Sequence, residues 1–530
     1  MKNKNNESNQ HNSHKSEFNQ YNMKKNISNN SQYIDKKIHE IHIDQYSISF
    51  LPSEVLKVWK KLIDKGYSAY LVGGCVRDLL LKRKPKDWDI TTNAKPEEIL
   101  EIFGKDAFYE NRFGTVGVKT KSEDESLKVI EITTFRQEKK YLDFRRPSEV
   151  TFTSNLETDL HRRDFTINAL ALSFEGKIID IFNGISDLNN RIIRAIGNPE
   201  ERFYEDALRL IRAIRLACEL NFQIEEKTFK AISKFSYLIQ YIAIERVRDE
   251  FNRILMSENA ILGVELLRQT GLLKEILPEL DRSYGVGQNK HHKYDVYTHL
   301  LKSLEYAVKK NYPLYLRLAA LLHDIGKPLT KQGEGPDCTF YGHEILGSKI
   351  TKKILQRLRY SNEIIQKVTH LVRHHMFYLE IDKVTPPAVR RFVKRVGWEH
   401  LEDLFKLRHA DRIGSGVPKA EPYRLRYLKY LIEKVHLEPI TPKMLKISGH
   451  DILNMGVLQG PKIGWILKIL LEEVIDDPKK NDRDYLLKRA QELKDLPDEE
   501  LKKLAMAGEE KIESIEKQKE EEIKKKYYVK

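Results

Sequence analysis

Cysteine and long apolar runs are both scarce in this chain. Its 530 residues include three cysteines, Cys75, Cys218 and Cys338, which lie far apart and lack C-x-x-C or Cys–His spacing. This pattern excludes a disulfide framework and a cysteine-based structural zinc site, and it indicates a reducing compartment. No stretch approaches the roughly 18 to 20 apolar residues that span a bilayer, and the N-terminus lacks the apolar core of a signal peptide. We therefore expect a soluble, cytoplasmic protein with no membrane partner.

Acidic residues are outnumbered by basic ones. The 92 Lys and Arg residues against 78 Asp and Glu residues give a net charge of +14, which favours contact with nucleic acid or nucleotide phosphate. At about 150 residues per domain, the length predicts three or four domains. Composition leaves the oligomeric state open.

The hydrophobic pattern of the chain changes three times. Residues 51–175 mix helical periodicity with short alternating runs, which predicts a domain of helices and strands. The segments at about 200–269, 297–412 and 442–500 are typical of amphipathic helices, the last broken by glycines at 449, 456, 460 and 464. In the first region, the expected elements are helices over 51–65 and 96–103 and strands over 67–72, 115–119 and 128–134.

A glycine pair stands between a predicted strand and a predicted helix, in the run Leu71-Val72-Gly73-Gly74-Cys75-Val76-Arg77-Asp78. Glycine lets the backbone approach a ligand closely, and a helix start offers N–H groups and its positive dipole end to a phosphate. Arg77 would lie in the first turn, where its guanidinium could hydrogen-bond a triphosphate. Taken alone, such a pair is more often only a tight turn.

Two carboxylates follow shortly after the glycine pair. Asp87 and Asp89 alternate in the strand-like run Asp87-Trp88-Asp89-Ile90, so both should project from one face. Like charges this close repel each other unless a cation lies between them. Two Mg²⁺ ions are the obvious candidates, one at an attacking hydroxyl and one at a triphosphate. An isolated pair would more often be a polar strand edge, but its place after the glycine helix favours a metal site.

A third carboxylate and a pair of arginines extend this candidate site. Glu131 lies in the alternating run 129–134 and would face the same edge if the strands are neighbours, although a surface Glu is an equal alternative. The run Arg162-Arg163-Asp164 precedes an apolar segment. Arg163 could clamp a phosphate, although the start of a surface helix would look similar.

A helix predicted over 204–215 carries a ridge of charge beside an apolar stripe. The charged residues are Asp206, Arg209, Arg212 and Arg215. One interpretation is a solvated face. The other is base recognition, because cytosine and adenine present an amino donor beside a ring-nitrogen acceptor, whereas uracil and guanine present the reverse. An accepting Asp206 beside a donating Arg209 would then select CTP and ATP without a nucleic-acid template.

Taken in order, these motifs resemble the set found in class II tRNA nucleotidyltransferases, the CCA-adding family, which share a head with bacterial poly(A) polymerases. The resemblance covers about residues 50–260. It rests on Gly73-Gly74-x-Val76-Arg77-Asp78, Asp87-x-Asp89, Arg162-Arg163-Asp164-Phe165-Thr166-x-Asn168-Ala169, Glu205-Asp206-x-x-Arg209 and Glu245-Arg246-Val247-Arg248-Asp249-Glu250. An A-adding enzyme or a poly(A) polymerase remains an alternative.

The resemblance implies a polymerase-beta-like nucleotidyltransferase head that adds C and A to the 3′ end of tRNA from CTP and ATP. It assigns the catalytic Mg²⁺ ions to Asp87 and Asp89, and we take Glu131 as a third catalytic carboxylate. The residues that match nucleotide-binding positions of the family are Gly74, Arg77, Arg163, Asp206, Arg209, Arg212 and Arg215. The segment 141–147 resembles the flexible loop that switches from C to A addition, which favours full CCA addition.

A second constellation, rich in His and Asp, lies between residues 299 and 411. A lone His is usually a core or surface histidine, but several at these spacings are hard to assign to chance. The pattern resembles HD phosphohydrolases over about residues 290–415. By that resemblance, one metal ion is held by His299, His323, Asp324 and Asp411. Imidazole and carboxylate ligands together suit a divalent transition metal or Mg²⁺. His343 with either His374 or His375, of which we choose His374, could complete a second metal site.

The HD resemblance implies hydrolysis of a phosphomonoester or a phosphodiester, such as a 2′,3′-cyclic phosphate at a damaged RNA end. An alternative from another class makes this phosphatase or cyclic phosphodiesterase the main activity, with the head serving to bind RNA. A non-catalytic RNA-binding protein is a third interpretation, against which the complete carboxylate sets argue.

The expected fold class is α+β, a small mixed-sheet head followed by mostly helical domains that include an all-α HD domain. The last helical stretch resembles the tail with which long bacterial relatives grip tRNA. The expected divisions are a disordered Asn-rich leader (1–45), the nucleotidyltransferase head (46–195), a helical neck and body (196–285), the HD domain (286–415), a tRNA-binding tail (416–500) and a charged C-terminal helix or tail (501–530).

Overall fold

The computed structural model describes residues 51–506, apart from 112–113, 142–143, 145–146, 291, 378–383, 417–420 and 437. The chain divides into two compact units, one ending at Tyr241 and the other beginning at Ile242. The predicted leader lies outside the described residues, as do 507–530 and parts of the loop at 141–147.

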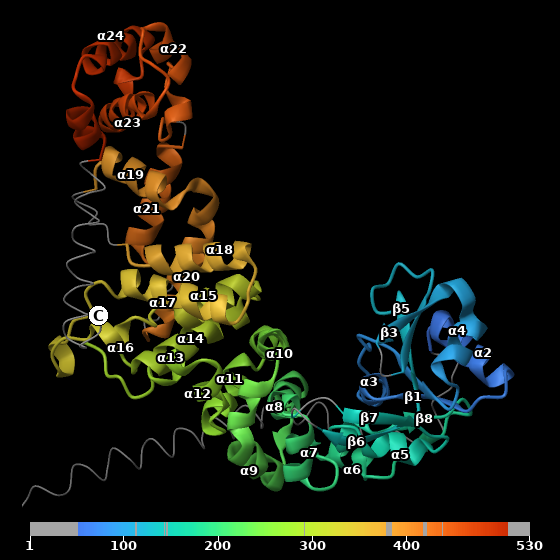
Figure 1. Ribbon diagram of the computed structural model, residues 1–530. Helices are drawn as coiled ribbons and strands as arrows, with labels where there is room; N and C mark the ends of the chain where they lie inside the picture. Colours follow the sequence, from blue (N-terminus) through green and yellow to red (C-terminus); the bar gives the residue numbers. More distant parts are fainter. Residues whose placement is uncertain are drawn as a thin grey trace, which may run out of the picture. The chain divides into compact units, whose positions relative to one another are not determined.

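The first unit is built on a mixed sheet with the strand order β3-β4-β5-β2-β1-β8-β9 (Figure 1). Strands β2 and β5 run parallel, and the other neighbouring strands in this order are antiparallel. The strands are β1 Ala69–Val72, β2 Asp89–Thr92, β3 Ala107–Asn111, β4 Thr115–Lys119, β5 Val129–Thr134, β8 Ala171–Leu172 and β9 Ile178–Ile179. Two smaller pairs join β6 Arg136–Tyr141 to β7 Pro147–Phe152 and β10 Ile192–Ile193 to β11 Gln223–Ile224. The predicted mixed-sheet head is confirmed.

Two helices, α2 (Ser53–Asp64) and α4 (Pro96–Phe103), pack on this sheet and on each other. Helix α2 buries Val55, Trp59 and Leu62, a spacing that places them on one face. The indole Nε1 of Trp59 donates to the carbonyl of Ala69 over 2.9 Å, which fixes the helix to β1. Both helices were expected at these positions from their periodicity.

Helices dominate the rest of the first unit. They are α3 Gly74–Leu80, α5 Leu156–His161, α6 Gly184–Asn189, α7 Pro199–Glu205, α8 Leu208–Leu220 and α9 Glu226–Phe235. The prediction of a single helix over 204–215 is wrong, because the helical conformation is interrupted between α7 and α8. Asp206 is extended at the break, and its Oδ1 accepts from the backbone N–H of Leu208 over 3.1 Å. A short acidic side chain that hydrogen-bonds its own backbone competes with helix continuation in this way.

The described residues of the second unit form helices and one isolated bridge, between Gln332 and Thr339. The prediction of an all-α HD region is confirmed. The longer helices are α10 Ile244–Met256, α11 Ala260–Gln269, α14 Val296–Lys309, α15 Leu314–Leu322, α17 His343–Arg357, α18 Asn362–His374, α19 Pro386–Val396, α20 Trp398–Gly414, α21 Tyr423–Lys434, α23 Pro461–Asp476 and α24 Arg483–Lys494. The shorter ones are α12 Leu272–Ile276, α13 Pro278–Asp281, α16 Lys327–Thr330 and α22 Gly449–Asn454.

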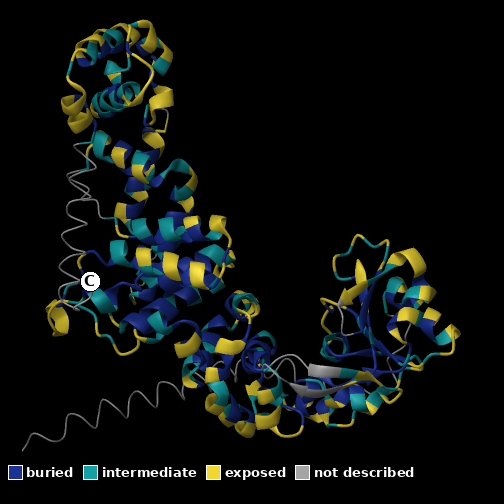
Figure 2. Ribbon diagram, viewed as in Figure 1, coloured by how far each residue is buried: buried dark blue, intermediate teal, exposed yellow. Residues whose placement is uncertain are grey.

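Helix α15 is the centre of the His-rich part of the second unit. It packs against α10, α14, α18 and α20, and its residues from Leu316 to Leu322 are all buried. In Figure 2, which colours the ribbon by burial, this part of the second unit contains much of the dark blue that marks buried residues. His323 and Asp324, which follow the C-terminal end of α15, therefore lie in the interior of the unit.

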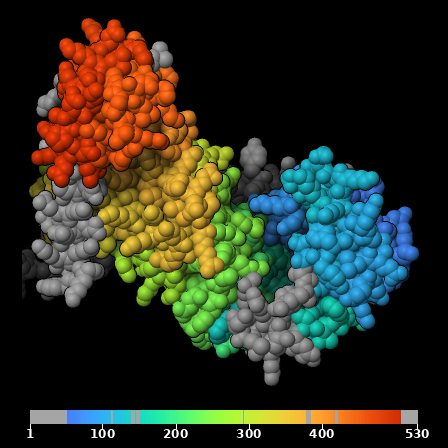
Figure 3. Space-filling model, turned by 45° about the horizontal axis from the view of Figure 1, so that its top comes forward, coloured from blue at the N-terminus to red at the C-terminus, as the bar shows by residue number. Residues whose placement is uncertain are grey.

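The C-terminal helices have a core of their own, which includes Ile452, Ile466, Leu470 and Leu486. They form the orange-to-red surface in Figure 3. Glycines 456 and 460 lie between α22 and α23, but Gly464 lies inside α23. The expectation that Gly464 breaks a helix is therefore wrong, since Pro461 starts α23 before it.

None of the described helices is both long and apolar enough to cross a membrane.

Candidate active sites

The glycine pair of the head forms a sharp turn between β1 and α3. Gly73 has a φ of 83°, a conformation that favours glycine, and a Cβ there would lie 2.9 Å from the Nη1 of Arg163. Helix α3 begins at Gly74, whose nearest side-chain atoms are Arg77 Nη2 at 3.7 Å and Asp87 Oδ1 at 3.8 Å from an added Cβ. The turn thus lies beside Arg77 and Arg163, the arginines expected at a triphosphate, and beside both paired carboxylates, since an added Cβ at Gly73 would also lie 3.6 Å from Asp89 Oδ2.

Three carboxylates lie close together beside this turn, at the start of the interior strand β2 and on its neighbour β5. Strand β2 begins at Asp89, with Asp87 just before it, and Asp89 is directly opposite Glu131 of the parallel strand β5. Loss of solvent and the neighbouring charges of Asp87 and Glu131 together raise the pKa of Asp89 to about 7, against the lowering effect of Arg163 and Arg212. The pKa of Glu131 is also raised, by desolvation and by Glu110 and Asp87. Crowded carboxylate oxygens of this kind are the donors that Mg²⁺ prefers.

A chain of polar contacts links the glycine turn to helix α8. The Nη1 of Arg77 donates to Asn168 Oδ1 over 2.8 Å, and Asn168 donates to Asp164 Oδ1 over 3.1 Å. Arg212 binds the other oxygen of Asp164 through Nε and Nη2, at 3.0 and 2.7 Å. Burial alone would raise the pKa of Asp164, but Arg212, Asn168 and Arg209 outweigh it and lower the pKa. This series of hydrogen bonds fixes the orientation of the guanidinium groups of Arg77 and Arg212.

The charged ridge of α8 is largely buried. Arg209 is 6% exposed and Arg215 4% exposed, so the interpretation of a solvated face is wrong. Arg209 donates to the carbonyls of Arg162 and Arg202, over 2.8 and 3.2 Å, and to Glu205 over 3.1 Å. These acceptors hold the guanidinium of Arg209 in place, while Asp206 lies in the break just before α8.

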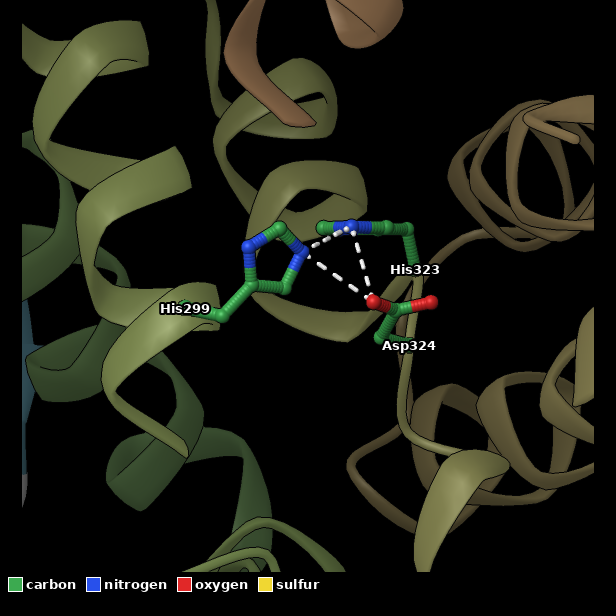
Figure 4. A group of neighbouring side chains, drawn as sticks. All are labelled: His299, His323 and Asp324. Carbon is green, nitrogen blue, oxygen red and sulfur yellow. Dashed lines mark hydrogen bonds and ion pairs between the residues drawn. The ribbon is translucent and has the colours of Figure 1, made fainter. Parts of the chain in front are cut away.

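Four residues expected to hold one HD metal come together in the second unit. His299 comes from α14, His323 and Asp324 follow α15, and Asp411 comes from α20. The Nε2 of His299 lies 2.9 Å from His323 Nε2, 3.1 Å from Asp324 Oδ2 and 3.5 Å from Asp411 Oδ1. Figure 4 shows both rings turned toward the Asp324 carboxylate. His299 and His323 have no exposed surface.

A second cluster shares Asp324 with the first. The other carboxylate oxygen, Oδ1, lies 3.2 Å from His343 Nε2 and 3.4 Å from His375 Nε2. His299, His323 and Asp324 form one group whose spacing suits a metal ion, and Asp324, His343 and His375 form another. Asp324 therefore lies between two groups of imidazoles, one facing each of its oxygens.

Three of these imidazoles are held by the same backbone contact. The Nδ1 atoms of His323, His343 and His375 hydrogen-bond the carbonyls of Ala320, Phe340 and Val372, at 3.0, 2.7 and 2.7 Å. Since a carbonyl only accepts, each Nδ1 carries the proton and each Nε2 is left with a lone pair. That tautomer, fixed by a carbonyl behind the ring, is typical of metal-binding histidines. The residues present therefore fit a divalent metal.

The choice of His374 for the second cluster is wrong, and His375 takes its place. His374 is the last residue of α18, where its ring lies 4.5 Å from that of His370 on the preceding turn. His375 caps the same helix and is 1% exposed. Successive residues of a helix point about 100° apart, so one of two neighbouring histidines faces the site and the other faces away.

Two further polar residues in this region were not predicted. Lys327 is buried, with its Nζ 2.6 Å from Asp324 Oδ2 and 2.7 Å from Gln288 Oε1. The ring of His292 lies 5.0 Å from that of His299. Burial and the neighbouring charge of Lys327 lower the pKa of His292 to about 3. The run Asp324-Ile325-Gly326-Lys327 contained the signal for Lys327, because an i,i+3 spacing sets a base beside an acid.

Close packing behind Asp324 depends on Gly326. A Cβ at this position would lie 2.4 Å from the carbonyl of His343 and 2.8 Å from the backbone N of Gly347. Any larger residue would push α17 away from the turn that carries Asp324. Gly326 thus lets the first residue of α17, His343, reach the carboxylate.

Three protein-family models match successive parts of the chain. "Poly A polymerase head domain" matches residues 69–194, "Probable RNA and SrmB-binding site of polymerase A" matches 221–284, and "HD domain" matches 296–413. Nucleotidyltransferase and HD domains generally use divalent metal ions, in agreement with the donor groups described above.

Relatives align along most of the sequence. The CCA-adding enzyme of Lactobacillus helveticus is 33% identical over 453 residues, which cover 86% of this chain and 100% of that protein. The chain belongs to the CCA-adding enzyme family. The CCA-adding enzyme of Lactococcus lactis subsp. lactis is 47% identical over 438 residues, covering 82% of this chain and 96% of the relative. The resemblance inferred from the motifs is confirmed.

Solved structures of CCA-adding enzymes share the fold. The Bacillus stearothermophilus CCA-adding enzyme in complex with CTP superposes with a TM-score of 0.61 and 28% identity, over 83% of this chain and 96% of that one. The Thermotoga maritima CCA-adding enzyme complexed with tRNA has a TM-score of 0.51 at 21% identity, over 84% of this chain and 96% of that one. As a member of the CCA-adding enzyme family, this chain is a tRNA nucleotidyltransferase that also has an HD domain.

Proposed function

We propose that this chain completes the 3′ end of tRNA by adding C, C and A from CTP and ATP, without a nucleic-acid template. Membership of the CCA-adding family supports this function, as does the binding of CTP by the related Bacillus stearothermophilus enzyme. The observation that carries the proposal is the meeting of Asp87, Asp89 and Glu131 beside the Gly73-Gly74 turn. Crowded acids beside a glycine turn and Arg163 form a site for metal ions and a triphosphate.

In this proposal, Asp87 and Asp89 hold two Mg²⁺ ions and Glu131 is a third acid of the same site. The ions would supply charge stabilisation at the attacking 3′ hydroxyl and at the departing pyrophosphate. Arg77, Arg163 and the N-terminus of α3 at Gly74 bind the triphosphate. The contact of Arg77 with Asn168 supports this role, because it aims the guanidinium before nucleotide binds.

Base selection falls to the start of α8. Asp206 offers acceptors and Arg209 offers donors, a pair that matches the edges of C and A and opposes those of U and G. The rigid support of Arg209 by two carbonyls and Glu205 favours this role, since a fixed donor discriminates better than a mobile one. Arg212 and Arg215 would line the same pocket.

The HD domain is proposed as a metal-dependent phosphohydrolase. His299, His323, Asp324 and Asp411 would hold one ion, and Asp324, His343 and His375 a second. Imidazole with carboxylate suits Mn²⁺, Fe²⁺, Ni²⁺ or Mg²⁺. When bound, the ion would act as a Lewis acid on a phosphoester, such as a 2′,3′-cyclic phosphate at an RNA end. The lone pairs that Nε2 of His323, His343 and His375 direct inward support the proposal.

We assign these roles to the domains expected from the sequence. The head contains the carboxylates, and α7 and α8 follow it with the base-selecting residues. The proposed domains are 46–195 for the head, 196–285 for the neck and body, 286–415 for the HD domain and 416–500 for the tRNA-binding tail.

The proposed activity can be tested with wild-type protein and three tRNA transcripts, ending before CC, before A and after CCA, each incubated with one nucleotide at a time. We expect C addition to the first, one A on the second and no extension of the third. Repeated A addition from ATP alone would indicate a poly(A) polymerase. Addition of A to the second transcript without C addition to the first would indicate an A-adding enzyme.

A second candidate function makes hydrolysis the main activity, with the head serving to bind RNA. The complete set of buried HD ligands favours an active HD site. Phosphatase or cyclic phosphodiesterase activity that disappears in Asp324→Ala, together with negligible nucleotide incorporation by wild type, would select this alternative.

A further inference from the structure

Helix α21 (Tyr423–Lys434) carries three tyrosines on the side opposite its buried face. Leu425, Leu428 and Ile432 are buried, whereas Tyr423 is 61% and Tyr430 is 56% exposed. At about 100° per residue, positions 423, 427 and 430 fall on one line, on the opposite side from the buried leucines. These rings are therefore not explained by the packing of the helix, which rests against α19.

The three rings form a continuous row, which we call the tyrosine ladder. The rings of Tyr423 and Tyr427 are 6.0 Å apart between centroids and inclined by 20°, and those of Tyr427 and Tyr430 are 6.1 Å apart and inclined by 32°. Single exposed apolar residues are ordinary and need no explanation, but adjacent aromatic faces on one line form a patch. Flat rings held nearly parallel on a rigid helix offer stacking surfaces.

Positive charge surrounds the tyrosine ladder. Helix α21 contains Arg424, Arg426, Lys429 and Lys434 against one acid, Glu433, for a net charge of 4 − 1 = +3. Arg424, Arg426 and Lys434 are exposed. Lys429 instead faces the protein, where its Nζ lies 5.1 Å from the ring centroid of Phe405 on α20. Aromatic rings interleaved with exposed basic groups are what surfaces for single-stranded nucleic acid are made of.

We propose that the tyrosine ladder is a binding surface for single-stranded RNA. Bases stack on the tyrosine rings, and Arg424, Arg426 and Lys434 meet the backbone phosphates. The inference rests on the proposed function in one respect, because that function supplies the RNA, the unpaired 3′ end of a tRNA. A paired stem hides the faces of its bases and would gain only the phosphate contacts.

Helix α21 lies against α20, a helix that contributes to the HD site. Through Lys429 and Phe405 the helix contacts α20, which also carries the HD residue Asp411. Glu421, just before α21, accepts from Lys429 and lies 3.7 Å from His409 of α20. An RNA end stacked on α21 is thus held on an element that touches a helix of the HD site.

The test is binding of the full-length protein to a short fluorescent single-stranded RNA of mixed sequence and to a blunt RNA hairpin, measured by anisotropy. EDTA in the buffer removes Mg²⁺ from the open site of the head, and all variants are compared in the same buffer. Replacing both exposed rings, Tyr423→Ala with Tyr430→Ala, should weaken single-strand binding by about tenfold and hairpin binding far less. The matched variant Tyr423→Phe with Tyr430→Phe keeps the rings and should bind like wild type.

Three results would overturn the proposal. They are unchanged single-strand binding by the alanine variant, an equal loss on the hairpin, and full binding by Tyr423→Leu with Tyr430→Leu, which has apolar surface but no ring. Nucleotide addition by wild type, measured in parallel with Mg²⁺, separates the two claims. If wild type extends tRNA while alanine substitution leaves RNA binding unchanged, the tyrosine ladder proposal fails and the proposed function stands.

Discussion

The two candidate metal sites of this chain differ most in their openness to solvent. In the head, Asp87 and Glu131 are exposed and Asp89 is partly buried, and all three come from neighbouring segments of one sheet. In the HD domain, His299 and His323 have no exposed surface, and the donors come from separate helices. An open site suits a reaction that must admit a triphosphate and the end of a polymer. A closed site suits an ion that is held between turnovers.

The sites also differ in how their acids are balanced. The head carboxylates repel one another, which together with desolvation raises the pKa of Asp89 to about 7. In the HD domain, burial would raise the pKa of Asp324, but Lys327 and the imidazoles hold it well below its usual range. Arg408 has the same effect on Asp411. In the head, Arg163 and Arg212 balance the acids only in part. In the HD site, Lys327, Arg408 and the imidazoles outweigh the effect of burial on the acids.

The largest effect is expected from Asp324→Asn, because this carboxylate faces both groups of imidazoles. Loss of an outer partner of a metal ligand costs about 10- to 100-fold in metal affinity, and loss of the shared carboxylate should cost more. Metal content of the purified protein, measured by mass spectrometry, should fall accordingly. Asp337→Asn, at an exposed Asp in the same domain, is the matched control. Equal metal content in both variants would contradict the assignment.

Chelation tests the difference in openness directly. A brief treatment with EDTA should abolish nucleotide addition, which Mg²⁺ alone should then restore. The HD metal should survive the same treatment, since its donors are buried, and metal analysis after rapid desalting would detect it. Loss of both metals at the same rate would remove the contrast between the two sites.

The neighbouring histidines of α18 provide a sharper test of the closed site. His375→Ala should lower metal affinity at the HD site by at least about tenfold, since it removes a donor to the second ion. His374→Ala should leave it unchanged, because that ring lies beside His370 instead. Isothermal titration with Mn²⁺ would measure both. A greater loss of metal affinity in His374→Ala than in His375→Ala would instead identify His374 as the ligand of the second ion, as first predicted from the sequence.

The smallest effect is expected in the open site, at Arg209. Arg209→Ala should relax discrimination against UTP and GTP more than it weakens binding of the triphosphate. An unpaired polar group in a binding site costs about 1–3 kcal/mol, so the discrimination should fall by roughly 5- to 150-fold. Competition between labelled CTP and UTP would measure it. Unchanged nucleotide choice would rule out recognition of the base edges.

The two sites also differ in how far the sequence predicted them. The head motifs lie on β2 and at the turn from β1 into α3. An alternation of two residues sets the direction of side chains on a strand, and a glycine pair marks the turn, so the positions of Gly74, Arg77 and Asp89 in these elements could be predicted. The helical break at Asp206 could not, because the run 204–215 has a helical pattern throughout. The side chain of Asp206 accepts a hydrogen bond from the backbone N–H of Leu208, which ends the helix despite the helical pattern of the sequence.

In the HD domain, the sequence identified the donors more easily than their directions. His299, His323 and Asp411 were found from the family pattern, but His374 and His375 are adjacent, and only the phase of α18 decides between them. Lys327 was missed because a lysine near an acid is usually solvated, whereas here close packing at Gly326 buries the turn that carries it.

Nucleotide addition should depend on the carboxylates of the head. The most direct measurement is incorporation of labelled CTP and ATP into tRNA lacking its 3′ end, by wild type, by Asp87→Ala with Asp89→Ala, and by the exposed control pair Asp64→Ala with Asp106→Ala. We expect incorporation to fall to background only in the Asp87 and Asp89 variant. Continued incorporation by that variant would contradict the assignment of the metal site.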